Sequence, residues 1–460
     1  MESNKIENLN DIKNIYFIGI GGSGMFPIAH ILKEKGFNIS GADIYESDTL
    51  EKVRNLGIKV YTEHKASNIA GQDLIVFSAA IKETNPEIQA AKSAGIPILE
   101  RSVMLGLIFN KYKDSVGVAG THGKTTTTSM ITSVLIDAKK DPTGVIGATL
   151  KKIGGNSCVG KSDVIVAEAC EYVDSFLELY PQISVITNVE ADHLDYFGTL
   201  ENVIKSFRKY ASQTLKTVIA NGDSETVLKA TENISPEVIY FGISENNEYR
   251  AKNIEFNNLQ QAEFDIFHHE KYCAHIKLRV PGEHNVLNAL AAYVTCEKLG
   301  VEAAEFEKSI ANFTGAHRRF EILLKGNGIT VADDFAHHPT EIETTLKSAS
   351  KMGFKRVWAI FQPHTFSRTF MFQNEFAKAL SIADKVIVSD ILPVRETNTY
   401  GVESTDLTDK IENSYYIPTF EEIAEFVTKN AQSGDLILTL GGGNVYKCAN
   451  MIVKKLSIRR

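Results

Sequence analysis

One short run near position 120 combines the residues that bind nucleotide phosphates. Residues 120–125 read GTHGKT and follow the strand-like run Ser115–Ala119. In such a turn, backbone N–H groups can surround phosphate oxygens, the Lys124 ammonium can neutralise the β and γ oxygens, and the Thr125 hydroxyl can bind Mg²⁺. The match to G-x-x-x-x-G-K-[ST] is incomplete, because Val118 stands at the first glycine. The preceding strand and the Gly-Lys-Thr core favour an ATP-cleaving site over a threonine-rich helix start without a ligand.

Two later strand ends carry side chains that could complete a magnesium site. Glu168 follows the apolar run Val164–Ala167, and His193 comes soon after the run Ile183–Ile186. Ligands of α/β sheets bind at the carboxyl ends of the strands. Taken alone, Glu168 could equally be a solvated helix cap that binds no metal, and His193 could equally be a histidine packed in the core. Together with Thr125, they are predicted to bind the metal. Three more acids are candidates to surround them: Glu171, Glu190 and Asp192.

A second glycine-rich turn lies near the start of the chain. Residues 19–24 read GIGGSG between a strand and a helical pattern over Met25–Lys35, and Asp43 ends the next strand. Glycines let backbone N–H groups approach a pyrophosphate, and an acid at this offset can bind a ribose. NAD and a UDP-sugar both fit the pattern, and a tight turn without a ligand is the alternative.

The elements that position these residues follow from the spacing of apolar runs. Short strands alternate with helical segments three times, which predicts three α/β domains with largely parallel sheets. We expect a Rossmann-like first domain over residues 1–112, a central P-loop-type ATPase domain over 113–317 and a Rossmann-like third domain over 318–460. The expected strands are Phe37–Ala42, Lys59–Tyr61, Leu74–Ser78 and Ile96–Leu99 in the first domain, and Gly328–Ala332, Arg356–Phe361, Lys385–Val388 and Leu436–Leu440 in the third.

Composition excludes several classes of protein. The chain has 460 residues, 43% hydrophobic and 23% charged, with a net charge of −8 and no basic block, which is typical of a globular protein and disfavours nucleic-acid binding. We expect no leader peptide and no membrane span, because no stretch of about 18 apolar residues occurs. The five cysteines form no C-x-x-C pair, which favours reduced thiols in the cytoplasm. We expect a monomer or a weak homodimer.

The sequence resembles the Mur ligase family over nearly its whole length. GTHGKT is similar to that family's phosphate loop, which lacks the first glycine. PGEHNVLNA at residues 281–289 resembles its adenine-contacting segment, and RRFE at 318–321 resembles its hinge into the third domain. The resemblance implies a UDP-sugar domain, a central ATPase domain, and a third domain that contacts ATP and presents an amino acid.

Further segments resemble members that use ATP and Mg²⁺ to add L-alanine to the lactyl carboxylate of UDP-N-acetylmuramate, a step of peptidoglycan precursor synthesis. These are residues 19–25, SAAIK at 78–82, DDFAHHPTE at 333–341 and FQPHTFSRT at 361–369. The resemblance implies UDP-sugar contacts from Gly21, Gly22, Ser23, Gly24, Asp43, Ser78 and Arg101. It implies ATP contacts from Gly120, Thr121, His122, Gly123, Lys124, Thr125, Thr126, His284, Asn285, Asn288, Arg319 and Asp334. The implied catalytic residues are Lys124, Glu168, His193, His337, His364 and Arg368, with His364 or His337 as a candidate base.

The chain departs from some relatives in the third domain and beside the metal site. Phe335 stands where some relatives have tyrosine, and Thr365 stands where some have arginine. We therefore expect recognition of the alanine carboxylate to depend more on Arg368 and His364. Arg208 stands nearest to a lysine that several relatives carbamylate, so we expect no such modification here.

Other readings remain open at this point. A recycling ligase that adds a whole tripeptide to the same sugar nucleotide is the nearest rival. A nicotinamide dehydrogenase would explain residues 19–24 but not GTHGKT. Asp333, Asp334, His337 and His338 form a weaker candidate for a transition-metal site. Residues 441–443, three glycines after a strand, are either a functional turn or merely a tight one.

Overall fold

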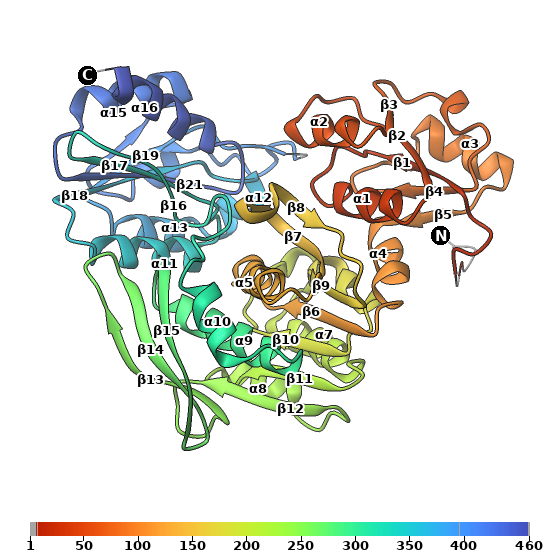
Figure 1. The fold of residues 1–460 in the computed structure, drawn as a ribbon. Helices are drawn as coiled ribbons and strands as arrows, with labels where there is room; N and C mark the ends of the chain where they lie inside the picture. The colour runs from red at the N-terminus through yellow and green to blue at the C-terminus, as the bar shows by residue number, and fades with distance from the viewer. Residues whose placement is uncertain (1–5, 7, 395, 459–460) are drawn as a thin grey trace. The chain divides into compact units, whose positions relative to one another are not determined.

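Three sheets organise the computed structural model, which describes residues 6, 8–394 and 396–458 (Figure 1). The chain divides into two compact units. One unit holds the chain up to Arg250 together with Phe267–Tyr272 and Leu287–Ser309, and the other holds Ala251–Ile266, Cys273–Val286 and the chain from Ile310 onward. The first two sheets have their main strands in the first unit, and the third sheet lies in the second.

The first sheet has five strands in the order β3-β2-β1-β4-β5, all parallel. Its central strands are apolar and buried, as parallel strands covered on both faces must be. Its strands are β1 (Asn14–Ile18), β2 (Asn38–Ala42), β3 (Lys59–Tyr61), β4 (Leu74–Phe77) and β5 (Ile98–Glu100), and its helices are α1 (Phe26–Glu34), α2 (Asp48–Asn55), α3 (Pro86–Ala94) and α4 (Arg101–Phe109).

The central sheet follows the order β15-β14-β13-β12-β11-β10-β6-β9-β7-β8. Its parallel middle is β6 (Asp114–Ala119), β9 (Val164–Glu168), β10 (Ile183–Ile186), β11 (Thr217–Asn221) and β12 (Glu237–Gly242), with β7 (Thr143–Leu150) and β8 (Gly155–Cys158) at one edge. The long strands β13 (Tyr249–Phe256), β14 (Gln261–His268) and β15 (Lys271–Pro281) extend the sheet at its other edge.

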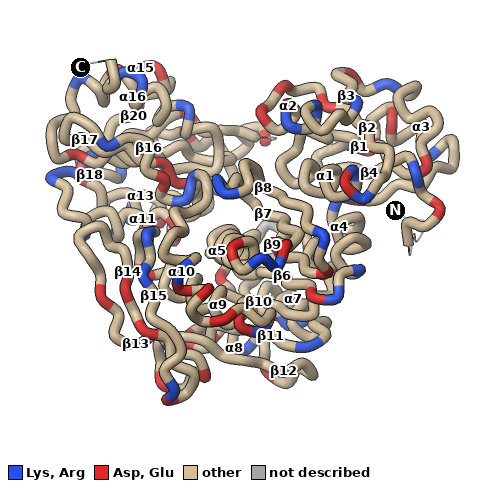
Figure 2. The backbone as a smooth tube through the Cα atoms, viewed as in Figure 1, with Lys and Arg blue, Asp and Glu red and all other residues tan. Residues whose placement is uncertain are grey.

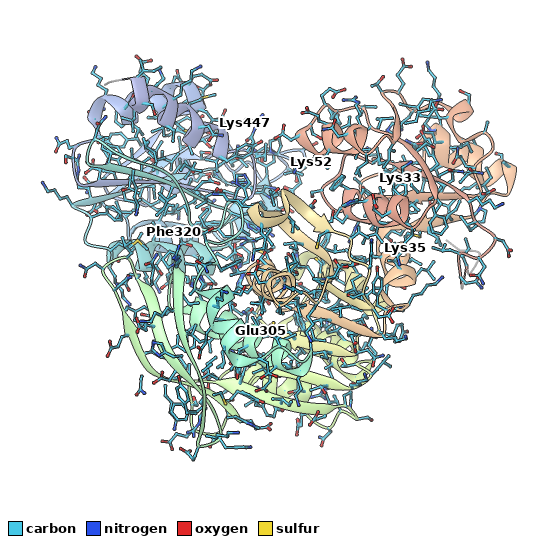
Figure 3. All side chains as sticks on the ribbon, in the orientation of Figure 1. Lys33, Lys35, Lys52, Glu305, Phe320 and Lys447 are labelled. Carbon is cyan, nitrogen blue, oxygen red and sulfur yellow. The ribbon has the colours of Figure 1, made fainter. Side chains whose placement is uncertain are left out.

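Helices and short 3₁₀ segments follow the strands of this sheet along the chain. The helices are α5 (Lys124–Asp137), α6 (Leu194–Phe197), α7 (Leu200–Ser212), α8 (Glu225–Thr231), α9 (His284–Lys298) and α10 (Ala303–Ile310), and the 3₁₀ segment between β9 and β10 is η3 (Tyr172–Glu178). Within the first domain, Lys35, labelled in Figure 3, places its ammonium 4.7 Å from the centre of the Tyr112 ring. The first and central domains contact each other where His30 Nδ1 lies 3.0 Å from the Ser157 hydroxyl.

The third sheet has the order β16-β17-β21-β18-β19-β20 and is parallel except for β16. Its strands are β16 (Glu321–Gly326), β17 (Ile329–Asp334), β18 (Arg356–Phe361), β19 (Lys385–Val388), β20 (Ser414–Tyr416) and β21 (Asp435–Leu440). The helices are α11 (Pro339–Ser350), α12 (Phe366–Met371), α13 (Gln373–Leu380), α14 (Thr405–Thr408), α15 (Phe420–Asn430) and α16 (Tyr446–Ile458). Pro339 opens α11, where its missing N–H costs nothing.

The three α/β domains predicted from the sequence are confirmed, and the expected strand bounds agree with the observed ones to within two residues. The expected strand Gly328–Ala332 is β17, which continues to Asp334, and the expected strand Ile96–Leu99 is β5, which begins at Ile98. The edge strand β16 was not predicted, because the half-exposed run EILLKG has neither a continuous apolar stretch nor strict alternation.

Charged residues of both signs are spread over the described chain. Figure 2 shows Lys and Arg mixed with Asp and Glu along the backbone. Among the described residues, no helix is both long enough and apolar enough to pass through a bilayer.

Candidate active site

The predicted phosphate loop is a tight turn between β6 and α5. Gly120 has φ +142° and Gly123 has φ +85°, conformations that residues with a side chain rarely adopt. A Cβ atom on Gly120 would lie 2.0 Å from Thr187 Oγ1, and one on Gly123 would lie 2.5 Å from Asn288 Oδ1. Gly123 is the N-cap of α5 and makes no side-chain cap hydrogen bond. The start of this helix is therefore suited to an anion, since Gly123 has no side chain that could cap it.

The segment that follows β10 holds the loop in place. Thr121 donates its backbone N–H to the Asn188 carbonyl oxygen. His122 donates its backbone N–H to the side-chain Oδ1 of Asn188 at 2.8 Å. The Thr187 hydroxyl donates to the His122 carbonyl at 2.6 Å, and Glu190 N–H donates to Thr121 Oγ1 at 2.8 Å. The sequence drew attention to Glu190 as an acid near the metal. It did not single out Thr187 or Asn188, whose roles come from the pairing of β6 with β10.

Lys124 stands at the start of α5 and points back over the loop. Its Nζ donates to the Gly120 and Thr121 carbonyl oxygens, the second at 3.1 Å, and lies 3.0 and 2.9 Å from the two carboxylate oxygens of Glu171. Burial acts to lower the pKa of Lys124, but the nearby negative charges, that of Glu171 foremost, outweigh burial and raise it. The ammonium is therefore charged at neutral pH.

The neighbouring strand β9 delivers a carboxylate to the helix start. Glu168, which pairs with Val118 across the sheet, accepts a hydrogen bond from the Thr125 hydroxyl at 3.1 Å through Oε2. Its other oxygen accepts the Gly147 backbone N–H. A hydroxyl and a carboxylate at the start of α5, where phosphate binding is predicted, are the oxygen ligands that Mg²⁺ prefers, so these residues fit the ion.

His193 lies on the chain that leaves the same edge of the sheet. Its backbone is left-handed (φ +53°), its ring centre lies 4.7 Å from that of Tyr172, and its Nε2 is 3.8 Å from an Asp192 carboxylate oxygen. Mg²⁺ prefers oxygen to nitrogen. Thr125 and Glu168 therefore fit the ion better than His193 does, and metal binding by all three stays a prediction.

In the first domain, Asp43, the acid predicted to bind a ribose, holds the glycine turn. Asp43 accepts the Gly21 N–H at 2.9 Å and the Tyr45 N–H at 3.1 Å. Arg101 packs against Gly24, where an added Cβ would lie 3.2 Å from its Cδ. The structure thus brings together Gly21, Gly24, Asp43 and Arg101 at one end of the first sheet.

Other residues predicted to bind the sugar nucleotide have partners nearby. Gly22 donates its N–H to the Gly19 carbonyl at 3.1 Å, the Ser78 hydroxyl accepts the Ala80 N–H at 3.2 Å, and Asn156 of β8 donates to the Ser23 carbonyl at 2.9 Å. Asn156 was not predicted. It ties the central domain to the glycine turn, and only the packing of β8 reveals it.

The residues predicted to face the adenine lie on α9. Asn288 accepts a hydrogen bond from the Thr127 hydroxyl at 3.2 Å and lies beneath Gly123, so it supports the phosphate loop. Asn285, in the second unit, donates to the Pro281 carbonyl at 2.7 Å, and His284 lies against Gly282.

At the carboxyl end of β17, Asp334 is turned toward backbone donors. It accepts the N–H groups of Phe320, labelled in Figure 3, at 2.6 Å and of Ala336 at 2.7 Å. Burial raises the pKa of Asp334 to about 6, although Arg319 acts against this rise. The Arg319 guanidinium lies 5.2 Å from the centre of the Phe335 ring.

Two of the predicted catalytic histidines face each other in the third domain. The ring centres of His337 and His364 are 6.1 Å apart. Burial, followed by the charges of His337 and Arg368, lowers the pKa of His364 to about 4. Its Nδ1 is buried and has no hydrogen-bond partner among the residues that the structure describes. A neutral imidazole with an unused nitrogen is suited to accept a proton or hydrogen bond from a ligand.

The transition-metal alternative at Asp333, Asp334, His337 and His338 finds no support. Asp333 is buried and accepts from Arg318 Nε at 2.7 Å and from the Thr439 hydroxyl at 2.5 Å. Within the described residues, a different cluster brings possible metal-ligand atoms within 4.8 Å of one another. It consists of Glu248, His268 and His269.

Residues 441–443 form the turn that follows β21. The Arg318 guanidinium donates to the Gly441 and Gly443 carbonyl oxygens, each at 2.7 Å. This turn therefore has a structural partner in the hinge.

Three family models match the chain in order. Residues 14–113 match the Mur ligase family catalytic domain, residues 118–296 the Mur ligase middle domain, and residues 318–443 the Mur ligase glutamate ligase domain. The chain belongs to the Mur ligase family.

Curated relatives of this Mur ligase cover it almost completely. The UDP-N-acetylmuramate–L-alanine ligase of Acetivibrio thermocellus is 44% identical over 99% of this chain and 98% of its own length. That of Caldanaerobacter subterraneus is 44% identical over 97% of this chain and 99% of its own.

Solved structures agree with this placement. The UDP-N-acetylmuramate–alanine ligase of Thermotoga maritima matches with a TM-score of 0.83 at 28% identity, covering 98% of this Mur ligase and all of that chain. A murein peptide ligase from Psychrobacter arcticus matches with a TM-score of 0.74 at 23% identity over 96% of this chain and 98% of that one, which shows a shared fold alone.

Proposed function

We propose that this Mur ligase uses ATP to join L-alanine to the lactyl carboxylate of UDP-N-acetylmuramate, in the synthesis of peptidoglycan precursors. Full-length relatives at 44% identity are named for this reaction, which supports the proposal. The structural observation that carries it is the edge of the central sheet, where Lys124, Thr125 and Glu168 surround the start of α5. We expect the reaction to take place in the cytoplasm.

The first chemical step overcomes the poor reactivity of a carboxylate. The lactyl carboxylate oxygen attacks the γ-phosphorus of ATP, and the bond between that phosphorus and the β,γ-bridging oxygen breaks. The products are an acyl phosphate and ADP. The N–H groups at the start of α5 and the Lys124 ammonium stabilise the charge that spreads over the transferring oxygens. Thr125 and Glu168, with His193 as the predicted third ligand, would hold Mg²⁺, which supplies further charge neutralisation to the phosphates.

The second step forms the amide. The uncharged amine of L-alanine attacks the acyl carbon, a tetrahedral intermediate forms, and inorganic phosphate leaves with the electron pair of the broken C–O bond. His364 is neutral at pH 7 and can accept a hydrogen bond or a proton from the amine, with His337 beside it. Arg368 would attract the carboxylate of the amino acid.

The sugar nucleotide is assigned to the first domain. The N–H groups of residues 21–24 at the start of α1 would contact the diphosphate, and Asp43 has lone pairs left for a ribose hydroxyl in addition to its two backbone contacts. Arg101 would supply a positive charge beside Gly24.

A phosphate-release assay tests this proposal. Purified protein is given Mg²⁺-ATP and UDP-N-acetylmuramate with L-alanine, with a murein tripeptide, or with no acceptor. Release that depends on L-alanine supports the proposal, and release with the tripeptide alone would replace it by the recycling reaction. If Mg²⁺-ATP does not bind even with the sugar nucleotide present, the ligase assignment fails. Glycine and serine as acceptors then define the amino-acid specificity.

A further inference from the structure

Glu171 is a buried carboxylate that meets the phosphate-loop lysine. Only 2% of the residue is exposed, and both of its carboxylate oxygens lie within 3.0 Å of Lys124 Nζ. The sequence pattern had placed this acid beside the metal. The structure instead puts it on the cation that the proposed mechanism assigns to the ATP phosphates.

The segment that carries Glu171 is held in a strained conformation. Val173 and Asp174 both adopt left-handed backbone conformations, with φ +54° and +55°, and neither is a glycine. Such residues persist only where surrounding contacts hold them. The Asp174 carboxylate accepts hydrogen bonds from Ser206 and from Tyr196 Oη, the latter at 2.9 Å. The contacts of Asp174 therefore help to hold the turn that directly follows Glu171.

We propose that Glu171 occupies Lys124 in the nucleotide-free protein and competes with the ATP phosphates for its ammonium. This inference rests on the proposed function, since it needs ATP to bind at residues 120–125. A lysine ammonium has three N–H donors, and here two loop carbonyls and one carboxylate already receive them. A phosphate oxygen can be bound at full strength only when Glu171 gives up its share.

The same geometry links nucleotide binding to the metal. When Lys124 moves to a phosphate, Glu171 is left as a buried anion next to a polyanion, which is strongly unfavourable unless another cation approaches. A magnesium ion on the phosphates is such a cation, because Thr125 and Glu168 lie beside the loop. Glu171 therefore disfavours metal-free ATP more than it disfavours Mg²⁺-ATP, and it acts as a positioning residue through Lys124.

Calorimetric titration of the full chain with three ligands tests the competition. The variant is Glu171→Gln, and the matched control is Glu178→Gln, an exposed acid of the same segment that ends η3. In Glu171→Gln, we expect metal-free ATP to bind about tenfold more tightly, Mg²⁺-ATP about threefold more tightly, and AMP, which has no β or γ phosphate, with unchanged affinity. Glu178→Gln leaves all three affinities unchanged. In steady state, the KM for ATP falls in Glu171→Gln while kcat does not rise.

Three outcomes would overturn the inference. ATP affinity in Glu171→Gln could be unchanged or weaker, AMP affinity could change as much as ATP affinity, or the metal-free and Mg²⁺-bound forms could shift equally, as expected if Glu171 only maintains the fold. If Glu171→Gln does not fold, Glu171→Asp is used, since its shorter side chain keeps the charge but draws it back from Lys124. For Glu171→Asp, we then expect the affinities for metal-free ATP and Mg²⁺-ATP to change in the same directions as in Glu171→Gln, by about half as much on a logarithmic scale. If these affinities do not change, the inference is overturned. If the unaltered chain does not bind Mg²⁺-ATP, the proposed function fails and this inference with it.

Discussion

The side chain of Asn188 makes a two-point contact with the backbone of His122. Its Oδ1 accepts the His122 N–H at 2.8 Å, and its Nδ2 donates to the His122 carbonyl at 3.0 Å. The Asn188 amide thus pairs with both the backbone N–H and the backbone carbonyl of His122. The middle of the phosphate loop therefore takes its shape from a neighbouring strand end as well as from its own glycines.

Removal of this contact should loosen the loop. We expect Asn188→Ala to raise the KM for ATP roughly tenfold, because two hydrogen bonds of about 1 kcal/mol each no longer hold the loop in its binding shape. The measurement is the ATP dependence of phosphate release. Asn430→Ala serves as the control, since the Asn430 side chain donates to the Phe426 carbonyl at an exposed helix end. Equal KM values for the two variants would contradict the prediction.

Lys124 should be essential for turnover. We expect Lys124→Ala to lower kcat for phosphate release by a factor of about 10³, as removal of one preorganised donor to a developing charge commonly does. Lys113→Ala, which removes an exposed lysine paired with Asp163, should turn over normally. Near-normal turnover in Lys124→Ala would disprove the role assigned to its ammonium.

The Thr125 hydroxyl should set the magnesium requirement. We expect Thr125→Val to raise the Mg²⁺ concentration needed for half-maximal activity roughly tenfold, because the isosteric side chain offers no oxygen ligand. Thr125→Ser keeps the hydroxyl and should stay close to the unaltered chain. A Mg²⁺ titration of initial rates separates the two, and identical curves for Val and Ser would remove Thr125 from the metal site.

His364 should give stability a measurable dependence on pH. The pKa of His364 is about 4 in the folded chain and near 6.5 when unfolded, so between these values the unfolded chain binds more protons and stability falls as the pH falls. His364→Asn removes this effect, so its stability relative to the unaltered chain should rise from pH 7.5 to pH 5. Urea unfolding at both pH values measures it.

His275 provides a control of opposite sign. Asp265 and then Glu263 raise the pKa of His275, so its contribution to stability is present below pH 6.5 and lost as the pH rises through the folded value. His275→Asn should therefore lose stability relative to the unaltered chain as the pH falls. The same sign for both variants would count against the assignment at His364.

Arg318 should matter for the stability of the third domain. Its guanidinium binds Asp333, Gly441 and Gly443 at once, and lysine cannot reproduce this planar arrangement. We expect Arg318→Lys to cost about 2–4 kcal/mol of unfolding free energy, because a buried aspartate and two carbonyl groups lose well-oriented partners. Urea unfolding checks this value, and Arg54→Lys at an exposed ion pair should change little. A loss no larger than that of Arg54→Lys would mean that the network does not stabilise the hinge.

Local features of this protein could be predicted from its sequence because they depend on neighbouring residues. The run from Ser115 to Thr125 predicts a strand, a turn and a helix start, and the structure has β6, a glycine turn and α5 there. The three α/β domains follow in the same way from alternating apolar runs, since one side-chain period marks strands and another marks helices. The family could be inferred because several such local motifs occur in order.

The partners of these residues were decided by the tertiary structure. Glu171 lies 47 residues from Lys124, and Asn188 lies 66 residues from His122. No local pattern specifies such pairs, since they arise from strand order and from the left-handed turn at Val173 and Asp174. The sequence therefore determined which chemical groups this enzyme has and which strand or helix carries each of them. The packing of the sheets decided which of those groups meet, because hydrogen bonds and ion pairs depend on distances in space and not on separation along the chain.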